Sequence, residues 1–353
     1  MNFSEINTPA VVIDRDIVER NVRRFQDYCA QKGLALRPHI KTHKLVELAR
    51  LQVAAGAVGI NCQKLGEAEV MAAHGLDDIL VTFNIIGEIK LARLVALATK
   101  VRNLAVTADS DYTVQGLSAA FTKSDKPLEV LVECDTGGQR CGVQTPDEAV
   151  AMAKQVALMP GLVFGGLMTY PAKGGTAAAQ AFLSDAERSL RSIGLPCKTI
   201  TSGGTPDMWQ AHTAPVVSEY RAGTYIYNDR SLVAGKTCGW EDCALSVLTT
   251  VVSTPAPGRA IIDAGSKALS SDLMGLDGFG YIIGHPQVRI AGLSEEHGHL
   301  ELPASSKPLQ VGQRLQVIPN HACVVSNLFS EVTFVRKGKV EKVVPVDARG
   351  CST

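Results

Sequence analysis

The stretch Leu36-Arg37-Pro38-His39-Ile40-Lys41-Thr42-His43-Lys44 places a lysine at the end of a short apolar run. A lysine at the C-terminal tip of a strand can form an imine with an aldehyde cofactor, and burial lowers its pKa enough for it to act as nucleophile and base. The flanking histidines and cations would suit a phosphate and a carboxylate. A solvent-facing basic loop is the alternative, since clusters of Lys, Arg and His are usually solvated.

Eight apolar, strand-like runs recur along the chain, and helical segments rich in Ala, Leu, Glu and Lys separate them. The runs are Leu34–Ile40, Ala57–Asn61, Ile79–Phe83, Asn103–Thr107, Leu128–Cys134, Leu162–Thr169, Cys197–Ser202 and Gly223–Tyr227. Their spacing, mostly about 20–35 residues, is what successive βα units require. The pattern predicts a TIM (β/α)8 barrel, because a six-strand doubly wound sheet would leave two runs unexplained.

After about Arg230 the pattern changes to β-branched runs without long helical segments between them. These runs are Ala244–Ser253, Arg259–Asp263, Arg314–Ile318 and Glu331–Val335, with Gly and Pro between them. They predict a C-terminal all-β domain. The early strand-like run Ala10–Ile13 precedes the first helix of the barrel and is assigned to the β domain as well. The predicted domains are a barrel at residues 14–230 and a β domain at residues 231–353 with residues 1–13.

The composition narrows the classes of protein. The 353 residues, of which 46% are apolar, suffice for two domains. Lys and Arg together number 35, as do Asp and Glu, so the zero net charge favours neither a nucleic acid nor a membrane as partner. We find no signal peptide, and no apolar stretch approaches the roughly 20 residues of a membrane helix. The nine cysteines, without repeated spacing, indicate reduced thiols in a cytoplasmic protein.

The carboxyl ends of barrel strands are where a TIM barrel places its chemistry. The residues that follow predicted strands there are Lys41, Glu133–Gly142, Tyr170, Ser202–Pro206 and Arg221–Tyr225. The turn Ser202-Gly203-Gly204-Thr205 suits a phosphate, because glycines let backbone N–H groups approach the anion and hydroxyls add donors. Barrel phosphate sites typically follow the seventh and eighth strands, where this turn falls. An ordinary glycine-rich turn is the alternative.

The sequence His321-Ala322-Cys323 is a candidate metal site. Two residues apart on a strand, the imidazole and the thiol would point to the same face. This donor pair suits zinc, and two protein ligands would suit a catalytic site completed by water and substrate. A core cysteine beside a satisfied histidine is the alternative. The loop Ser294–His299 could supply further ligands or hydrogen-bond partners, or be a solvated turn.

Together these motifs resemble the family of D-threonine aldolases and D-serine dehydratases, pyridoxal-phosphate enzymes of the alanine-racemase-like fold (fold type III). The resemblance extends from Thr8 almost to the C-terminus. The motifs that carry it are Arg37–Lys44, Thr136-Gly137, Gly203–Pro206, Gly223–Tyr225, Asp263–Lys267, Ser294–Gly298 and Pro319–Cys323. It implies a barrel that binds pyridoxal 5′-phosphate and a C-terminal β domain. It also implies a head-to-tail homodimer, with the active site between one subunit's barrel and the other's β domain.

The resemblance also implies roles for residues of the barrel. Lys41 would form the Schiff base and handle the α-proton, with His39 beside the cofactor. Tyr170 is similar to the family's active-site tyrosine, Arg221 would face the pyridine nitrogen, and Arg140 would lie beside the ring. The implied ligands of the cofactor phosphate and its surroundings are Ser202, Gly203, Gly204, Thr205, Gly223, Thr224 and Tyr225.

Two further positions complete this comparison. His321 and Cys323 resemble the family's metal ligands, with zinc favoured and manganese or magnesium as alternatives. Asp207 is a departure, because the family has a small or hydroxylic residue at that position, directly after Thr205-Pro206.

The predicted function is that of a lyase on a small D-3-hydroxy amino acid. In dehydration, Lys41 removes the α-proton and the metal draws off the β-hydroxyl, which yields a keto acid and ammonia. In retro-aldol cleavage, the Cα–Cβ bond breaks to give glycine and an aldehyde. The His-x-Cys pair resembles zinc-dependent D-serine and D-3-hydroxyaspartate dehydratases, whereas the aldolases more often have His-x-Asp, which suits manganese or magnesium.

We therefore predict the dehydratase and keep the D-threonine-aldolase-type reaction as the alternative. An amino-acid racemase is a more distant alternative, because racemisation needs bases on both faces of Cα and leaves the His-x-Cys pair without a purpose. A non-catalytic protein that binds pyridoxal phosphate would have only the barrel, whereas this chain has a β domain as well.

Overall fold

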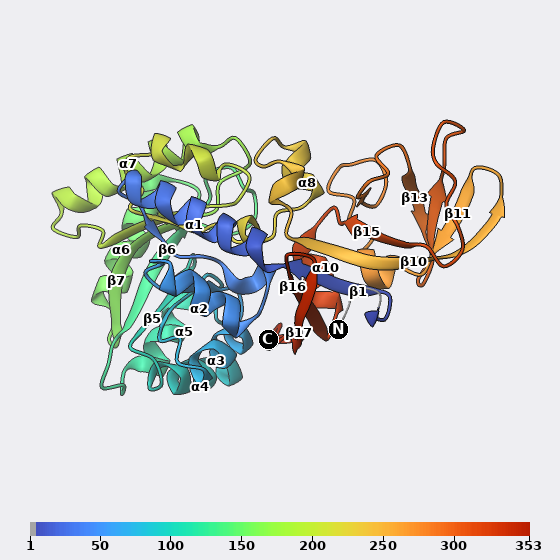
Figure 1. Ribbon diagram of the computed structural model, residues 1–353. Helices are drawn as coiled ribbons and strands as arrows, with labels where there is room; N and C mark the ends of the chain where they lie inside the picture. The colour runs from blue at the N-terminus through green and yellow to red at the C-terminus, as the bar shows by residue number, and fades with distance from the viewer. Residues whose placement is uncertain (1–4) are drawn as a thin grey trace. The chain divides into compact units, whose positions relative to one another are not determined.

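The structure is a computed structural model that describes residues 5–353, in which the chain divides into two compact units. The barrel unit comprises residues 25–41, 45–223 and 350–353, and the sheet unit comprises the described residues up to 24 together with 42–44 and 224–349. The first long helix, α1 (Arg15–Gln31), contributes residues to both units (Figure 1). Among the helices of residues 5–353, none combines the length and the apolar character needed to cross a bilayer.

The barrel unit is built from parallel strands that alternate with helices. Its strands are β2 (Ala35–Leu36), β3 (Ile60–Cys62), β4 (Asp78–Val81), β5 (Asn103–Ala108), β6 (Leu128–Cys134), β7 (Leu162–Thr169), β8 (Thr199–Ser202) and β9 (Glu219–Tyr220). The helices between them are α2 (Val46–Ala54), α3 (Leu65–Ala73), α4 (Glu88–Ala98), α5 (Asp111–Phe121), α6 (Pro146–Leu158) and α7 (Thr176–Ser192), with a 3₁₀ helix, η3 (Met208–Thr213), before β9. The strand order is β2-β9-β8-β7-β6-β5-β4-β3.

The two ends of this strand order join and close the barrel. His39, just after β2, forms a parallel bridge with Asn61 in β3. The N–H of Val58 donates to the carbonyl of Leu36 at 2.9 Å, and the N–H of Asn61 donates to that of Pro38 at 2.8 Å. The predicted TIM barrel is therefore confirmed, with β2 and β3 as its closing pair.

The prediction of the eighth strand at Gly223–Tyr227 is wrong. The eighth strand is β9, and Thr224–Ile226 forms a 3₁₀ turn, η4, in which Tyr225 and Ile226 are buried. A short apolar run cannot by itself distinguish a buried strand from a buried helical turn. The candidate segment Arg221–Tyr225 nevertheless follows the eighth strand, at its carboxyl end.

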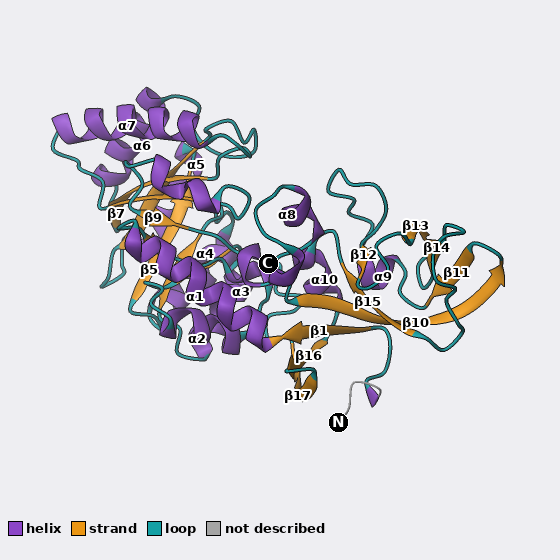
Figure 2. Ribbon diagram, turned by 45° about the horizontal axis from the view of Figure 1, so that its top comes forward, coloured by secondary structure: helices purple, strands orange, loops and turns teal. Residues whose placement is uncertain are grey.

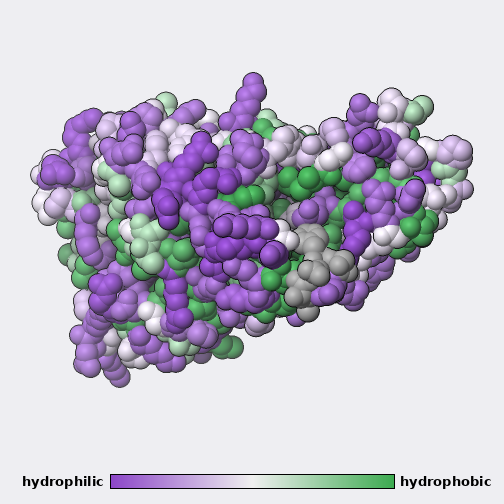
Figure 3. Space-filling model, viewed as in Figure 1, coloured by the Kyte–Doolittle hydropathy of each residue, from purple (hydrophilic) through white to green (hydrophobic). Residues whose placement is uncertain are grey.

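Helix α1 shows how the sequence divides its two faces. Val18, Val22, Phe25 and Cys29, spaced three or four residues apart, are buried, as a helical period of 3.6 requires. The opposite face is exposed and carries Arg20 and other charged residues. Figure 3 shows a hydrophilic surface over this helix, so α1 covers its neighbours with an apolar face and presents charge to solvent.

The sheet unit is mainly antiparallel (Figure 2). Its strands are β1 (Ala10–Asp14), β10 (Leu245–Ala256), β11 (Arg259–Ile262), β12 (Tyr281–Ile282), β13 (Arg289–Leu293), β14 (Gly298–Glu301), β15 (Arg314–Ile318), β16 (Glu331–Arg336) and β17 (Lys339–Pro345). Short helices lie between them: α8 (Arg230–Ala234), η5 (Trp240–Asp242), α9 (Ser266–Leu269) and α10 (Ala322–Leu328). The strand predicted at Ala10–Ile13 is present as β1, which pairs with β10 antiparallel and β16 parallel.

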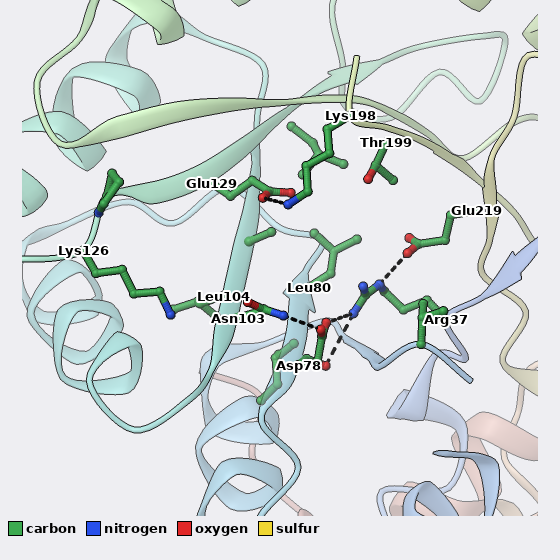
Figure 4. A pocket seen from close by; sticks show the side chains of 15 residues that line it. Arg37, Asp78, Leu80, Asn103, Leu104, Lys126, Glu129, Lys198, Thr199 and Glu219 are labelled. Atoms are coloured by element: carbon green, nitrogen blue, oxygen red, sulfur yellow. Dashed lines mark hydrogen bonds and ion pairs between the residues drawn. The ribbon is translucent and has the colours of Figure 1, made fainter. Parts of the chain in front are cut away.

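A pocket of about 280 Å³ lies at the amino-terminal mouth of the barrel (Figure 4). Arg37 bridges two carboxylates there: its Nη1 is 2.7 Å from Oδ1 of Asp78, and its Nε is 2.8 Å from Oε2 of Glu219. Burial alone would lower the pKa of Arg37, but the two carboxylates raise it above its ordinary value. Arg37 is thus a structural cation of this mouth.

Replacing Arg37 by Met should lower the free energy of unfolding by ~3–5 kcal/mol, because the buried Glu219 would lose its ion pair and Asp78 would keep only its contacts with Asn103 and the exposed Arg102. Urea unfolding followed by circular dichroism measures the change. Arg102→Met is the matched control, since the Arg102 side chain is 65% exposed and its ion pairs with Asp77 and Asp78 should contribute less than ~1 kcal/mol. Equal losses in the two variants would contradict this assignment.

Candidate active site

Lys41 lies in a short 3₁₀ turn, η2 (Ile40–Thr42), after β2 at the carboxyl end of the barrel strands. Its Nζ is 3.4 Å from Oε1 of Gln63, and its backbone N–H donates to Nδ1 of His39 at 3.4 Å. Gln63 directly follows β3. Since parallel strands present their carboxyl ends at one mouth of a barrel, these residues meet there.

His39 is a neutral neighbour of Lys41. The imidazole is only 7% exposed, and its Nε2 lies 3.1 Å from Oε1 of Gln63. Burial, together with the positive charges of Lys41 and Arg221, holds the pKa of His39 well below its ordinary value. The site therefore gains no further positive charge from His39 at neutral pH.

The turn Ser202–Thr205 has the form of an anion cradle. A Cβ atom on Gly203 would lie 2.5 Å from the carbonyl oxygen of Arg221, so only glycine fits against that strand end. A Cβ on Gly204 would lie 3.3 Å from the ring of Tyr170. Glycines leave the backbone N–H groups accessible, and the nearby hydroxyls can donate hydrogen bonds as well. The turn therefore fits the phosphate that the resemblance implies.

Two hydrogen bonds fix the position of the Ser202–Thr205 turn. The Tyr220 hydroxyl donates to the carbonyl of Gly204 at 2.8 Å, and the N–H of Gly223 donates to Oγ1 of Thr205 at 3.3 Å. Tyr220 is buried against Phe25, with ring centroids 6.1 Å apart. The orientation of the glycine turn is thus fixed by the core of the barrel unit.

Tyr170 and Arg140 lie together beside the cradle. The Arg140 guanidinium lies over the Tyr170 ring, 4.9 Å from its centroid, and the tyrosine is 43% exposed. Asp207, the departure from the family pattern, accepts a hydrogen bond from the N–H of Gly174 at 2.7 Å. This carboxylate therefore fixes the loop after Tyr170.

Arg221 is buried inside the barrel. It donates from Nε to Oγ1 of Thr201 at 3.0 Å and from Nη2 to the carbonyl of Thr169 at 2.6 Å. Burial lowers its pKa to about 10, so it stays charged at neutral pH. Glu133, at the end of β6, is also buried, and burial raises the pKa of its carboxyl although the charge of Arg140 acts in the opposite direction.

In the sheet unit, His321 and Cys323 form a close pair, but they do not lie on a strand as predicted. His321 has an extended backbone (φ −137°, ψ 98°) and caps helix α10, whereas Cys323 lies in its first turn. The backbone changes from extended at His321 to helical at Ala322. Nδ1 of His321 is 2.7 Å from Oδ2 of Asp272, which leaves Nε2 for the sulfur or for a metal.

Two hydroxyls also contact the Cys323 sulfur. Oγ1 of Thr42 is 3.2 Å from Sγ, and Oγ1 of Thr224 is 3.4 Å from it. In the chain, Thr42 directly follows Lys41 and Thr224 directly follows Gly223. The sulfur therefore contacts residues adjacent in sequence to those predicted to bind the cofactor.

The charges of the pair suit a metal. Burial would raise the pKa of the Cys323 thiol, but the hydrogen bond and the charge of His321 lower it below its ordinary value. Burial likewise opposes the charge on His321, yet Cys323 and then Asp272 raise the pKa of His321 to about 9. A divalent cation bound by the pair would take the place of the imidazole proton, since metal ligands bind deprotonated. The donor set fits zinc.

The other candidate ligands do not join this pair. Among residues 5–353, no three side chains of His, Cys, Asp or Glu come together as a metal site. Glu295, Glu296 and His297 are exposed in a turn. Completion of the site by water and substrate stays a prediction.

The remaining basic residues of the opening stretch each have a protein partner, and a role for them in binding a phosphate or a carboxylate stays a prediction. Arg37 binds carboxylates at the amino-terminal mouth. The ring of His43 packs edge-on to Tyr227, with centroids 6.4 Å apart, and Lys44 donates to Oδ1 of Asn327 at 2.9 Å. Tyr225, expected near the cofactor, is buried in the turn η4.

The sequence interpretation missed Gln63, Tyr220 and Asp272, whereas Glu133 lies in the candidate segment Glu133–Gly142. Gln63 and Glu133 each lie at the carboxyl end of a buried strand, where chemistry on a barrel is expected, so their position was a usable signal. Asp272 lies 49 residues from His321 in the chain, and no local pattern connects the two.

Comparison with known proteins supports the resemblance. The family model "Alanine racemase, N-terminal domain" matches residues 13–231, and "Putative serine dehydratase domain" matches residues 244–335. The chain is 35% identical over 370 residues to a 3-hydroxy-D-aspartate aldolase of Paracoccus denitrificans (strain Pd 1222), covering 99% of this chain and 94% of the relative. It is 34% identical over 353 residues to a D-threo-3-hydroxyaspartate dehydratase of Delftia sp. (strain HT23), covering 92% of this chain and 93% of the relative.

Solved structures agree with these matches. The crystal structure of a D-threonine aldolase from Filomicrobium marinum has a TM-score of 0.93 at 33% identity, covering 99% of this chain and 98% of that one. Structures of a D-threo-3-hydroxyaspartate dehydratase include variants with alanine at a histidine and at a cysteine two positions later, the second in a metal-free form. This chain belongs to the family of D-threonine aldolases and D-serine dehydratases, lyases with the alanine-racemase fold.

Proposed function

We propose that this chain is a dehydratase of D-3-hydroxy amino acids that uses pyridoxal 5′-phosphate and zinc to form a keto acid and ammonia. The observation that carries the proposal is the His321–Cys323 pair, with Nδ1 of His321 held by Asp272. A thiolate is a soft ligand that favours zinc over manganese or magnesium. The related dehydratase has histidine and cysteine variants with the same two-residue spacing, which supports a functional role for such a pair.

The barrel residues would bind the cofactor. Bound pyridoxal phosphate would supply an electron sink for negative charge at Cα of the substrate. Lys41 would hold it covalently, and its amine would carry the α-proton. The Ser202–Thr205 turn with Gly223 and Thr224 would hold the phosphate, with Tyr225 behind it. Arg221 would keep the pyridine nitrogen unprotonated, because a cation there disfavours a second positive charge.

Two other barrel residues would complete the site around the substrate. Arg140 would lie beside the ring, as its cation–π contact with Tyr170 supports. Tyr170, exposed next to Gly204, would contact cofactor and substrate. His321 and Cys323 would hold the metal, whose Lewis acidity would be directed to the β-hydroxyl of the substrate.

Retro-aldol cleavage to glycine and an aldehyde is the second candidate. It is supported by the 3-hydroxy-D-aspartate aldolase at 35% identity and by the D-threonine aldolase fold at a TM-score of 0.93. The two reactions share the binding residues and differ in which bond to Cβ breaks. The thiolate ligand of this chain is what favours loss of the hydroxyl.

The assembly and the cellular location stay predictions. A head-to-tail homodimer with the barrel of one subunit facing the β domain of the other, and a cytoplasmic location, both follow from the resemblance and the composition. Neither a nucleic acid nor a membrane is expected as a partner, since the net charge is zero.

Product analysis should separate the two reactions. The purified protein is loaded with pyridoxal phosphate and either zinc or manganese, then incubated with D-serine, D-threonine or D-threo-3-hydroxyaspartate. We expect keto acid and ammonia in equal amounts, with zinc as the better metal. Glycine with an aldehyde, strongest with manganese, would instead establish the aldolase. The L-enantiomers serve as the control for stereochemistry.

Lys41→Ala should abolish the visible absorbance of lysine-bound pyridoxal phosphate, because no other amine would take its place beside His39 and Gln63. Absorbance spectra of the loaded protein measure this. Lys198→Ala is the control, since Lys198 pairs with Glu129 at the amino-terminal mouth and should leave the spectrum unchanged. An unaltered spectrum in Lys41→Ala would rule out the assigned lysine.

Cys323→Ala should spare the pyridoxal-phosphate spectrum but remove bound zinc and lower turnover about 100-fold or more, since Lewis-acid stabilisation is worth several kcal/mol. Metal content by atomic absorption and keto-acid production are the measurements. The exposed Cys141→Ala is the matched control. Wild-type turnover by Cys323→Ala after chelation would show that the thiolate has no part in the reaction.

A further inference from the structure

Gln63 holds a fixed orientation beside Lys41. Its Nε2 donates to the carbonyl of Thr82 at 2.8 Å, and its backbone N–H donates to Oε2 of Glu67 at 2.8 Å. Because only the amide nitrogen can donate to the Thr82 carbonyl, Oε1 must face the other way, toward His39 and Lys41. The side chain therefore presents an uncharged acceptor to both residues.

This orientation also sets the tautomer of His39. Oε1 of Gln63 can only accept, so Nε2 of His39, 3.1 Å away, carries the proton. Nδ1 is then the acceptor for the backbone N–H of Lys41. The neutral imidazole is consistent with the lowered pKa of His39. Gln63 thus fixes both the backbone and the amine of Lys41, directly and through His39.

We infer that Gln63 is a positioning residue for the bond between Lys41 and the cofactor, an inference that rests on the proposed function. That bond forms between Nζ and the aldehyde carbon, and the aldehyde oxygen leaves as water. The nitrogen must be unprotonated and directed when it attacks. A neutral acceptor at 3.4 Å directs the amine without the strong preference for the ammonium form that a carboxylate would impose.

The charges around Gln63 explain why an uncharged acceptor suits the reaction of Lys41. Arg221 directly follows β9 and is bound to Thr201 and Thr169, and its positive charge acts on His39. A carboxylate at position 63 would face Lys41 and would stabilise the protonated lysine. Glutamine gives the same acceptor geometry without that effect.

The test compares Gln63→Met, which keeps the size of the side chain and removes the acceptor, with wild type and with the exposed Gln210→Met. Apoprotein is mixed with pyridoxal 5′-phosphate, and formation of the lysine-bound absorbance is followed over time. We expect Gln63→Met to form it about tenfold more slowly, the loss typical of one hydrogen bond to a charged or reacting group. Gln210→Met should match wild type.

A second ligand separates positioning from a purely structural role. Pyridoxine 5′-phosphate has the same ring and phosphate but an alcohol in place of the aldehyde, so it cannot bond to Lys41. Its dissociation constant, from quenching of tryptophan fluorescence, should be unchanged in Gln63→Met. If Gln63→Met weakened the binding of pyridoxine 5′-phosphate as much as it slowed the reaction with pyridoxal 5′-phosphate, Gln63 would have only a structural role. If Gln63→Met formed the lysine-bound absorbance at the wild-type rate, the inference would be overturned.

Gln63→Glu gives an independent test that keeps an acceptor beside Lys41, although its carboxylate cannot donate to the carbonyl of Thr82. At pH 7.5 it should also form the absorbance slowly, and raising the pH should restore its rate, because the carboxylate raises the pKa of the lysine. A Gln63→Glu rate equal to wild type at pH 7.5 would contradict the need for a neutral acceptor. If wild type itself forms no lysine-bound absorbance, the proposed function fails, which is distinct from a failure confined to the Gln63 variants.

Discussion

The backbone hydrogen bonds between residues 36–39 and residues 58–61 close the parallel barrel, and the barrel site depends on that closure. Without it, β2 and β3 would be edge strands with unpaired polar groups. Closure also brings the segment after β2 beside the segment after β3. Lys41, His39 and Gln63 can share hydrogen bonds only because those two strand ends adjoin.

The two mouths of the barrel handle charge in different ways. At the amino-terminal mouth, Arg37 is neutralised by Asp78 and Glu219, so the charges there serve the fold. At the carboxyl-terminal mouth, Lys41 and Arg221 lie near a neutral His39 and a Glu133 whose pKa is raised. The second mouth thus brings the cations Lys41 and Arg221 near a neutral imidazole, whereas at the first mouth two carboxylates offset the charge of Arg37.

In the sheet unit, the charges of His321 and Cys323 likewise depend on burial and on neighbouring charges. Each side chain alone would lose its charge on burial, but together they stabilise imidazolium and thiolate. Asp272 fixes one nitrogen of the ring, and the hydroxyls of Thr42 and Thr224 contact the sulfur. These contacts give the proposed metal pair a fixed imidazole and a hydrogen-bonded sulfur.

The sequence by itself determined the fold class and most of the candidate residues. Periodic strand and helix patterns depend on local composition, so the barrel, the β domain and the runs at Leu128–Cys134 and Leu162–Thr169 could be identified directly. Local motifs likewise identified Lys41, the Ser202–Thr205 turn and the His-x-Cys pair. What these share is that the residues of each motif lie close together in the chain.

Only the tertiary structure decided which residues surround those motifs. The eighth strand, the helical setting of Cys323 and the partners of Arg37 all depend on contacts between segments far apart in sequence. Gln63 contacts Lys41, and Asp272 contacts His321, because the fold brings together segments that are far apart in the sequence. No local sequence pattern predicts such contacts. The residue types that give each motif its chemistry lie close together in the sequence. The geometry and the charge of those residues depend on burial and on contacts with residues far away in the chain.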